Sequence, residues 1–431
     1  MKAFVITLSV LAFPAALLAQ DSARPIALDE AVRLARRNAP AAVQARNSIR
    51  QSSATVRTNY ASFLPTFSAS SGASRSEGQN LGPSGNLVAI TRPWAGSHGI
   101  SSSLELFDAG RRYFNLRAAQ ANLDAAESAE VTQSFTVALN VKQQYFAVLA
   151  ARESDSAARK QLEQAEQQLR AAVARVAAGA ATRSDSLRSS IQVGNARLAI
   201  LTAANNLATA NASLSRLVGS TEFVTALAGD TAVTGNIALA DAELFRLAES
   251  GPVVTQALAT TIAAKQSARS SKTPYLPTVS MRFGATYNSA ADAFQLWGDQ
   301  RNYQYSTSFS VNFPIFNGLG REESVVRARI TEENAQANLR DARLNARQQM
   351  VQQLGTFRTA EARVQIQLAS VVAGEEDLRV QQERYNLGAS TLLDLLTSQT
   401  TLDQARQALI QARLDARTAK AQIEALIGRD L

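Results

Sequence analysis

The stretch Arg384–Leu396, "RYNLGASTLLDLL", places one glycine inside a long run of residues that otherwise favour helix. An earlier stretch, Arg175–Leu187, reads "RVAAGAATRSDSL" and has the same construction. Gly179 and Gly388 fit the left-handed residue that commonly ends a helix. Each stretch therefore predicts a tight turn between two helices.

The residues after each glycine predict how the next helix begins. Thr182 and Thr391 fit the N-cap position, where a hydroxyl can satisfy a free backbone N–H group. Asp185 and Asp394 follow three residues later, where the helix dipole favours negative charge. The purely structural interpretation is two well-capped helical hairpins. A functional role of the turns would be additional to this structural role.

The two hairpins belong to two copies of one unit. Corresponding residues stay 209 positions apart along the long helical segments, which indicates a duplication without insertions in its helices. Shorter segments align as well, such as "FLPTFSAS" at 63–70 with "YLPTVSMR" at 275–282. The pairs that share the constant separation are Phe107 with Phe316, Gly179 with Gly388, Asp185 with Asp394, and Gly219 with Gly428.

Each copy predicts a helix, a strand hairpin, a long helix and a final helix. The first copy, 20–219, has helices at about 28–62, 109–178 and 182–218, with strands at about 65–76 and 97–107. After a linker at 220–238, the second copy, 239–431, has helices at about 239–272, 318–387 and 391–427, with strands at about 277–288 and 301–313. Pro65 and Pro277 end the first helices, because the residue before a proline is disfavoured in helix.

The final helices carry apolar residues at alternating three- and four-residue spacing, from Val193 to Leu217 and from Leu402 to Leu426. This period is typical of helices that supercoil around a neighbour. The long helices before them would each extend roughly 100 Å at about 1.5 Å per residue. That length argues against a compact bundle and favours an elongated molecule.

The strands are of the length and pattern found in membrane barrels. Phe283, Tyr305, Phe309 and Val311 are alternate residues that we expect to face lipid, with Trp297 near the outer interface. Four strands cannot close a barrel, since small barrels need about eight. A symmetric homo-oligomer is implied, three chains being the simplest solution. A soluble four-stranded sheet with one wet face remains the alternative.

Composition excludes several classes of site. The chain has no cysteine and one histidine, His98, so thiolate metal sites, cysteine nucleophiles and histidine triads are not expected. The formal charge is +8, but the arginines alternate with acidic residues and form no basic block for nucleic acid. We expect no enzyme activity, no cofactor and no metal site.

The N-terminus predicts export. Lys2 precedes an apolar run from Ala3 to Ala19, interrupted by Pro14 and ending in small residues, which is typical of a signal peptide at 1–19. A membrane anchor is the alternative, although the run is marginal in length for a spanning helix.

Together the duplicated order, the "FLP" and "YLP" strand entries, "LFDAGRR" with "PIFNGLGRE", and the two glycine turns resemble the TolC-type outer membrane efflux proteins, over about Ile26 to Gly428. The resemblance implies a mainly α fold with a small transmembrane β part. As a homotrimer it would form a 12-stranded barrel in the outer membrane, continued by a long α-helical barrel in the periplasm. It further implies an exit duct that works with a periplasmic adaptor and an inner-membrane pump, and no nucleic acid partner.

The resemblance also implies roles for residues at the turns. In the family an aspartate, a tyrosine and an arginine hold the periplasmic tip closed. Asp185 and Tyr385 match the first two, while the arginine position is Ser390. Asp394 matches an aspartate that lines the entrance, and the second such position is Thr397. A nearby arginine could take the missing role, the candidates being Arg183, Arg188 and Arg384.

Two other classes of protein share some of these features. A periplasmic adaptor would have one helical hairpin flanked by compact β domains, whereas this chain has two full repeats. A trimeric surface adhesin would carry its barrel strands near the C-terminus, whereas here the strands lie in the first half of each repeat. The transported substrate and the class of pump cannot be read from the sequence.

Overall fold

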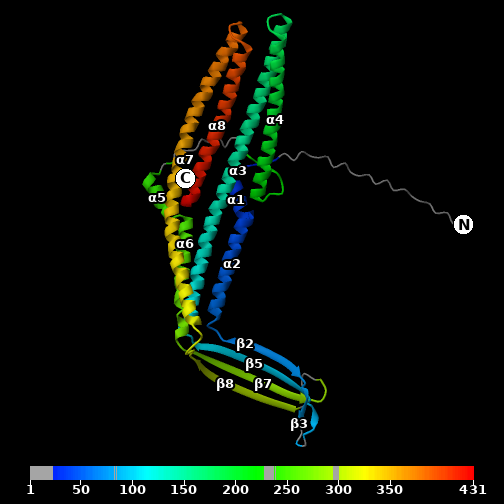
Figure 1. Cartoon of the computed structure of the whole chain (residues 1–431), viewed down its shortest axis with the longest axis vertical. Coiled ribbons are helices and arrows are strands. Elements are labelled where there is room, and N and C mark those ends of the chain that lie inside the picture. The colour runs from blue at the N-terminus through cyan, green and yellow to red at the C-terminus, as the bar shows by residue number, and fades with distance from the viewer. Residues whose placement is uncertain (1–22, 82, 84, 228–236, 238, 295–299) are drawn as a thin grey trace, which may run out of the picture.

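A computed structural model describes residues 23–431 except 82, 84, 228–236, 238 and 295–299. The expected signal peptide at 1–19 and Trp297 lie outside the described residues. The molecule is elongated, with helices over most of its length and a β-sheet at one end (Figure 1). No described helix is both long enough and apolar enough to cross a membrane.

Two long helical hairpins form the body of the molecule. The first joins α3 (Arg111–Ala177) to α4 (Arg183–Val218), and the second joins α7 (Gly320–Asn386) to α8 (Leu392–Ile427). Every boundary of the second hairpin lies 209 residues after its counterpart in the first. The helices on the sheet side of α4 and α8 come from the start of each repeat (Figure 1).

Those first helices differ from the prediction, because each is broken. The segment predicted as one helix at 28–62 forms α1 (Leu28–Asn38) and α2 (Pro40–Ala61). The segment predicted at 239–272 forms α5 (Asp241–Glu249) and α6 (Pro252–Ser270), followed by the short helix η1 (Thr273–Tyr275). A proline stands at the first position of α2 and of α6, which fits a helix start and forces the preceding residue out of helical geometry.

Each repeat has its own apolar core, at the level where these breaks occur. In the first repeat Val141, Tyr145 and Leu214 are fully buried, and in the second Met350, Leu354 and Ile423 take the corresponding places. The cap glycines of α4 and α8 pack against the breaks. A Cβ built on Gly219 would lie 2.9 Å from Cβ of Asn38, and one on Gly428 would lie 2.6 Å from Cγ of Pro252.

Two short strands were missed in the sequence, one of them in the segment predicted as a linker. β1 (Arg24–Ile26) pairs in parallel with β6 (Val224–Ala226). The buried Tyr145 hydroxyl donates to the carbonyl of Ile26 at 3.1 Å and accepts from the amide of Leu227 at 3.1 Å. Within the predicted linker, β6 is therefore packed against the first core, whereas Ile237 packs against the second.

The larger sheet has four antiparallel strands in the order β2 (Thr66–Ser74), β5 (Trp94–Phe107), β7 (Thr278–Ala291) and β8 (Gln300–Asn312). A separate hairpin, β3 (Glu77–Leu81) with β4 (Leu87–Thr91), lies between the two strands predicted for the first repeat. The two strand pairs share one register, since Thr66 lies opposite Ser103 and Thr278 lies opposite Asn312.

The sheet has two chemically different faces. Residues in register share a face, so pairing places Phe283, Tyr305, Phe309 and Val311 together, and all four are exposed in the single chain. The opposite face is mainly polar, and serines pair across its strands, as Ser280 does with Ser310 at 2.8 Å. The apolar face includes Phe67, Ala69, Ile100, Leu104, Met281, Phe283, Tyr305, Phe309 and Val311, and the polar face includes Ser68, Ser101, Ser103, Arg282, Gln304, Ser308 and Ser310.

Candidate functional site: the tip of the helical hairpins

Both glycine turns lie at the end of the molecule farthest from the sheet (Figure 1). Gly179 and Gly388 have φ angles of 71° and 73°, the left-handed conformation expected of them. The amide of Ala180 donates to the carbonyl of Arg175 at 2.8 Å, and Ala389 does the same to Arg384 at 2.8 Å. These bonds satisfy carbonyls that the ending helices leave free.

Thr182 and Thr391 stand at the N-cap positions of α4 and α8. Asp185 accepts hydrogen bonds through Oδ2 from the amide of Thr182 at 3.0 Å and from its hydroxyl at 2.8 Å. Asp394 accepts from the amide and hydroxyl of Thr391 at 3.0 and 2.7 Å. These hydrogen bonds from the threonine hydroxyls and amides lower the pKa of both aspartates below its ordinary value.

Tyr385 has a partner that sequence reasoning missed. Its side chain is only 8% exposed and packs with Leu392, Leu395 and Leu396 at the start of α8. The guanidinium carbon of Arg175 lies 4.4 Å from the centre of the Tyr385 ring, and its Nη1 donates to the Tyr385 carbonyl at 2.8 Å. One arginine of the first hairpin therefore holds the tip of the second.

The other expected gate contacts are local within the single chain. Asp185 and Tyr385 lie on different hairpins, and no hydrogen bond joins these two described side chains. Ser390, at the position where the resemblance implies an arginine, can donate its hydroxyl hydrogen to Asp394 Oδ2 or to Gln381 Oε1, each at 3.1 Å. Thr397 donates to the carbonyl of Leu393 at 2.8 Å, one turn back in its own helix.

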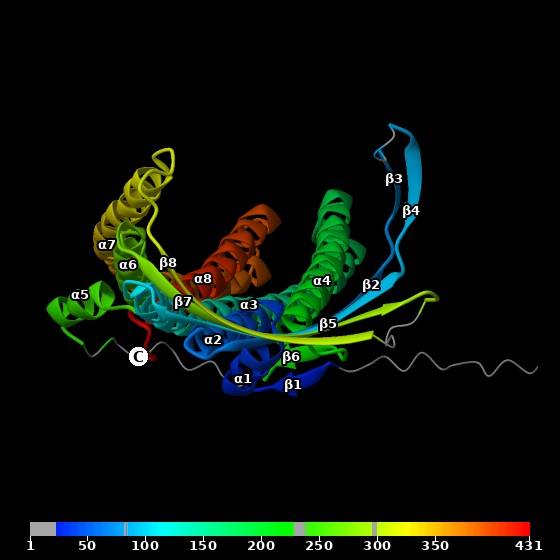
Figure 2. The same ribbon diagram turned by 90° about the horizontal axis from the view of Figure 1, so that it is seen from below.

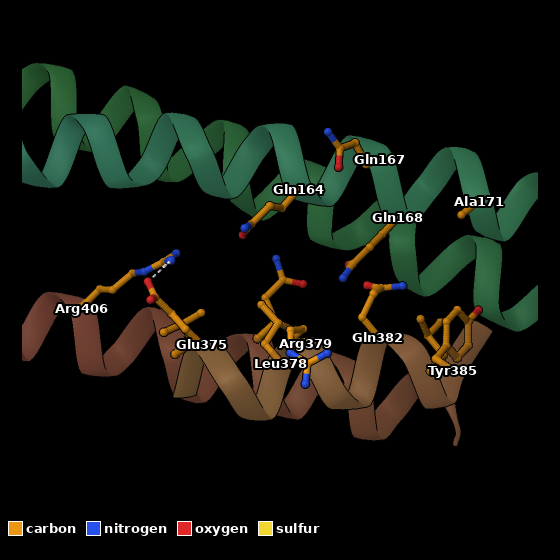
Figure 3. A pocket seen from close by; sticks show the side chains of 13 residues that line it. Gln164, Gln167, Gln168, Ala171, Glu375, Leu378, Arg379, Gln382, Tyr385 and Arg406 are labelled. Atoms are coloured by element: carbon orange, nitrogen blue, oxygen red, sulfur yellow. Dashed lines mark hydrogen bonds and ion pairs between the residues drawn. The ribbon is translucent and has the colours of Figure 1, made fainter. Parts of the chain in front are cut away.

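A cleft of about 510 Å³, lined by glutamine, charged and leucine side chains, separates the two hairpins just below the tip. Figure 3 shows amide side chains of α3 facing α7 across it, with Arg406 bonded to Glu375 at one end and Tyr385 at the other. The buried Oε1 atoms of Gln164 and Gln168 have no hydrogen-bond partner among the described residues. At this level Arg175 and Tyr385 join the two hairpins, whereas lower down each hairpin packs into the apolar core of its own repeat.

Comparisons with known proteins agree with this architecture. The family model "Outer membrane efflux protein" matches residues 31–220 and 246–429. The chain is 28% identical over 403 residues to "Protein CyaE" of Bordetella pertussis, covering 90% of this chain and 81% of that protein. It is 29% identical over 383 residues to the "Pyoverdine export outer membrane protein OpmQ" of Pseudomonas aeruginosa, covering 85% and 77%.

Solved structures share the fold at low sequence identity. A structure of CusC, described in connection with transmembrane channel formation, superposes with a TM-score of 0.80 at 19% identity, covering 93% of this chain and 92% of CusC. The outer membrane protein VceC of Vibrio cholerae gives a TM-score of 0.77 at 17% identity, covering 94% and 96%. The predicted fold class, a mainly α chain whose duplicated repeat contributes to a helical tunnel and to barrel strands, is confirmed.

The fold and the duplicated hairpins define an outer-membrane channel with a helical tunnel that extends into the periplasm. The chain belongs to the outer membrane efflux protein family. It is an exit duct of an efflux or secretion system, as the sequence predicted. The family and the fold are those of channels, which are not enzymes.

Proposed function

We propose that three copies of this chain form one passive duct, without catalysis of its own, that carries substrates from an inner-membrane pump and a periplasmic adaptor to the exterior. The observation that carries this proposal is the pair of unpaired edges. β2 and β8 are the two edges of the sheet, and unpaired strand edges need a partner in a membrane. A second and third copy would supply that partner and close the barrel with twelve strands.

The helical part supports the same arrangement. Within the chain, α3 of the first repeat contacts α8 of the second. The equivalent contact between copies would join α7 of one copy to α4 of the next, since the repeats correspond helix by helix. Both of these helices expose large apolar side chains in the single chain, namely Leu187, Leu198 and Leu201 on α4 and Leu344, Val351 and Ile366 on α7.

We further propose that the tip is the gated end of the duct. Asp185 and Tyr385 would help to hold it closed, and Asp394 would line the entrance. The turns lie at the far end of the helices, and a cleft separates the hairpins below them. Arg175 contacts Tyr385 and would take the role of the family's arginine, whose position is Ser390 in this chain. Phe283, Tyr305, Phe309 and Val311 would face lipid at the opposite end.

Detergent-solubilised protein tests the proposal in two measurements. Native mass spectrometry should give a trimer, and a monomer would end the assembly proposal. In planar bilayers the wild type should show a low resting conductance that rises in the Asp185→Ala, Tyr385→Phe double variant. An intact trimer with unchanged resting conductance would reduce these residues to helix caps while leaving the duct itself in place.

A further inference from the structure

Lys142 of α3 forms ion pairs with the second repeat at the level of the apolar cores. Its side chain is only 15% exposed, and its Nζ atom lies 2.6 Å from Glu424 Oε2 in α8 and 2.8 Å from Asp430 Oδ1 just after that helix. A lysine is seldom covered to this extent without a carboxylate partner. The end of α8 therefore covers this part of α3 and is held there by charge.

Two more charged contacts follow along α3 toward the tip. The guanidinium carbon of Arg417 lies 5.7 Å from the centre of the Phe146 ring, and Arg413 Nη1 lies 3.7 Å from Glu153 Oε2. Both arginines belong to α8, so each contact joins the two repeats. We call the ion pairs of Lys142 together with these two contacts the charged seam, which is the junction between α3 and α8 inside one chain.

The duplication identifies the surfaces that would form the equivalent junction between two copies, α7 of one copy with α4 of the next. Corresponding residues in these helices lie 209 positions apart. None of the positions that correspond to the charged residues of the charged seam carries a charge. The counterparts are Val351 for Lys142, Ala362 for Glu153, Ala204 for Arg413, Ala208 for Arg417, Ser215 for Glu424 and Thr221 for Asp430.

The counterpart surface on α7 is apolar and uncovered in the single chain. Val351 is 59% exposed, and Leu344, two helical turns earlier on the same face, is 68% exposed. Gly355 takes the position of Phe146 one turn beyond Val351, and a Cβ built on it would meet nothing within 4 Å. At the end of α4, Phe223 follows Thr221 by two residues and is 52% exposed. Both sides of the equivalent junction thus expose large apolar groups.

We propose that this surface of α7 binds the end of α4 from a second copy, with Phe223 of one copy packed against Leu344 and Val351 of the next. Figure 2 shows α4 and α7 toward opposite sides of the curved chain, where each can meet another copy. The inference rests on the proposed trimer and adds the residues and the chemistry by which the copies join. The copies are held by an uncharged contact, whereas the two repeats of one chain are held by ion pairs.

This difference in chemistry disfavours an exchange of partners between the two junctions. Against the end of α4, Lys142 would meet Thr221 in place of a carboxylate. Against the surface of α7, Glu424 would meet Val351 in place of an ammonium group. A buried charge without its partner is strongly unfavourable, and such mismatches let an interface reject a wrong partner. The charged seam therefore keeps the repeats of one chain together and leaves the apolar surface for another copy.

Native mass spectrometry of the detergent-solubilised protein over a dilution series tests the docking surface. Val351→Asp places a carboxylate on it, opposite a segment that already carries Glu222, and should weaken trimer formation at least about tenfold. Val372→Asp is the matched control, because Val372 is a valine of α7 with 63% exposure and its counterpart Glu163 is bonded within its own helix. Unchanged trimer formation in Val351→Asp, or an equal loss in Val372→Asp, would overturn the proposal.

A second variant tests whether the end of α4 is the partner. Thr221 is exposed in the single chain, so Thr221→Lys can be added to Val351→Asp without disturbing a core. The double variant recreates between copies, with the charges reversed, the ion pair that Lys142 and Asp430 form within a chain, and it should recover most of the lost trimer. A double variant that is no more trimeric than Val351→Asp would overturn the proposal. A monomeric wild type would end the trimer proposal and this one with it, whereas a trimeric wild type with either failure overturns the docking surface alone.

Discussion

At the scale of single residues, the tip joins two kinds of contact. Asp185 and Asp394 are engaged by their own threonine caps, so they stabilise helix starts whatever else they do. Arg175 is different, because it reaches from one repeat to the ring and carbonyl of Tyr385 in the other. The cross-repeat contact is the one that can couple the two hairpins.

We expect Arg175→Ala to raise the resting conductance in planar bilayers. The substitution removes a cation–π contact and a charged hydrogen bond, together on the order of 2 kcal/mol for each copy. Arg384→Ala is the matched control, because Arg384 is the corresponding position in the second repeat. The hydrogen bond to the Tyr385 carbonyl comes from Arg175 and not from Arg384. Equal conductance in the two variants would remove Arg175 from the gate.

The lowered pKa of Asp394 predicts how ion preference depends on pH. Hydrogen bonds from Thr391 and Ser390 depress the folded-state pKa below the ordinary value of 3.8, so the carboxylate stays charged at neutral pH. Its stabilising bonds are complete above about pH 4 and are lost only as the pH falls through the depressed pKa. Asp394→Asn should therefore reduce cation preference at pH 7, measured as reversal potential in a salt gradient. A reduction that already vanishes at pH 5 would contradict this assignment.

The sequence predicted the caps but not the arginine, and the reason is separation along the chain. The glycine, threonine and aspartate of each turn interact within a few residues, so their spacing carries the information. Arg175 and Tyr385 are 210 residues apart and meet only because α3 and α7 are placed beside the same cleft. The candidates predicted from the sequence, Arg183, Arg188 and Arg384, all lie at or next to the turns themselves.

At the scale of elements, the strands were the clearest part of the sequence and the helix breaks the least clear. The alternation in β7 and β8 is strong enough to assign faces. β1 and β6 have three residues each and no alternation to read, so they are recognised only by their packing near Tyr145. A proline can either begin a helix or kink one, so Pro40 and Pro252 do not by themselves reveal a break. Because the helical pattern continues on both sides of each proline, the sequence predicted one helix where there are two.

The two faces of the sheet predict opposite outcomes for neighbouring arginine substitutions in β8. Phe309→Arg places charge on the apolar face opposite Met281 and should cost about 2–4 kcal/mol near the bilayer midplane. Ser308→Arg lies on the polar face, opposite Arg282, and should insert nearly as well as the wild type. Yield of folded protein in the outer-membrane fraction measures both. The reverse order would mean that the polar face meets lipid.

The cap glycines predict a difference between the core and the tip. Gly428→Ala should destabilise the protein by more than the roughly 1–2 kcal/mol expected for an alanine in the left-handed region, because its Cβ would meet Pro252 at 2.6 Å. Gly388→Ala has nothing within 4 Å and should cost only the backbone term. Thermal unfolding of the two variants in the same detergent makes the comparison. Equal losses would mean that the break between α5 and α6 can move to make room.

At the scale of the whole molecule, the duplication relates contacts inside a chain to contacts between chains. α3 corresponds to α7, α4 to α8, β2 to β7 and β5 to β8. Several buried core positions coincide as well, among them Val141 with Met350, Tyr145 with Leu354, and Leu214 with Ile423. Figure 2 shows the chain as a curved layer, with α4 and β2 toward one side and α7 and β8 toward the other. The junction between repeats is therefore a template for the junction between copies.

This correspondence predicts the register between β8 and β2 of the next copy. Within the chain, β5 and β7 pair with Gly99 opposite Thr286. Moving each residue to its repeat counterpart places Ser308 opposite Ser74 of the next copy, both on the polar face. Directly opposed residues in an antiparallel pair have Cα atoms about 4.5–5.5 Å apart, which a disulfide can bridge.

The chain has no cysteine, so introduced pairs can be read without background. We expect Ser308→Cys with Ser74→Cys to give covalent dimers and trimers on a non-reducing gel after mild oxidation. Asn312→Cys with Ser74→Cys is the matched control, because Asn312 lies four residues along β8, about 13 Å away. Crosslinking in the control pair alone would show that the register between β8 and β2 differs from the predicted one. Crosslinking in neither pair of an intact trimer would show that the copies do not join through β8 and β2. Since the repeat junction is the only basis for this register, the result tests directly whether the assembly repeats the contacts of the single chain.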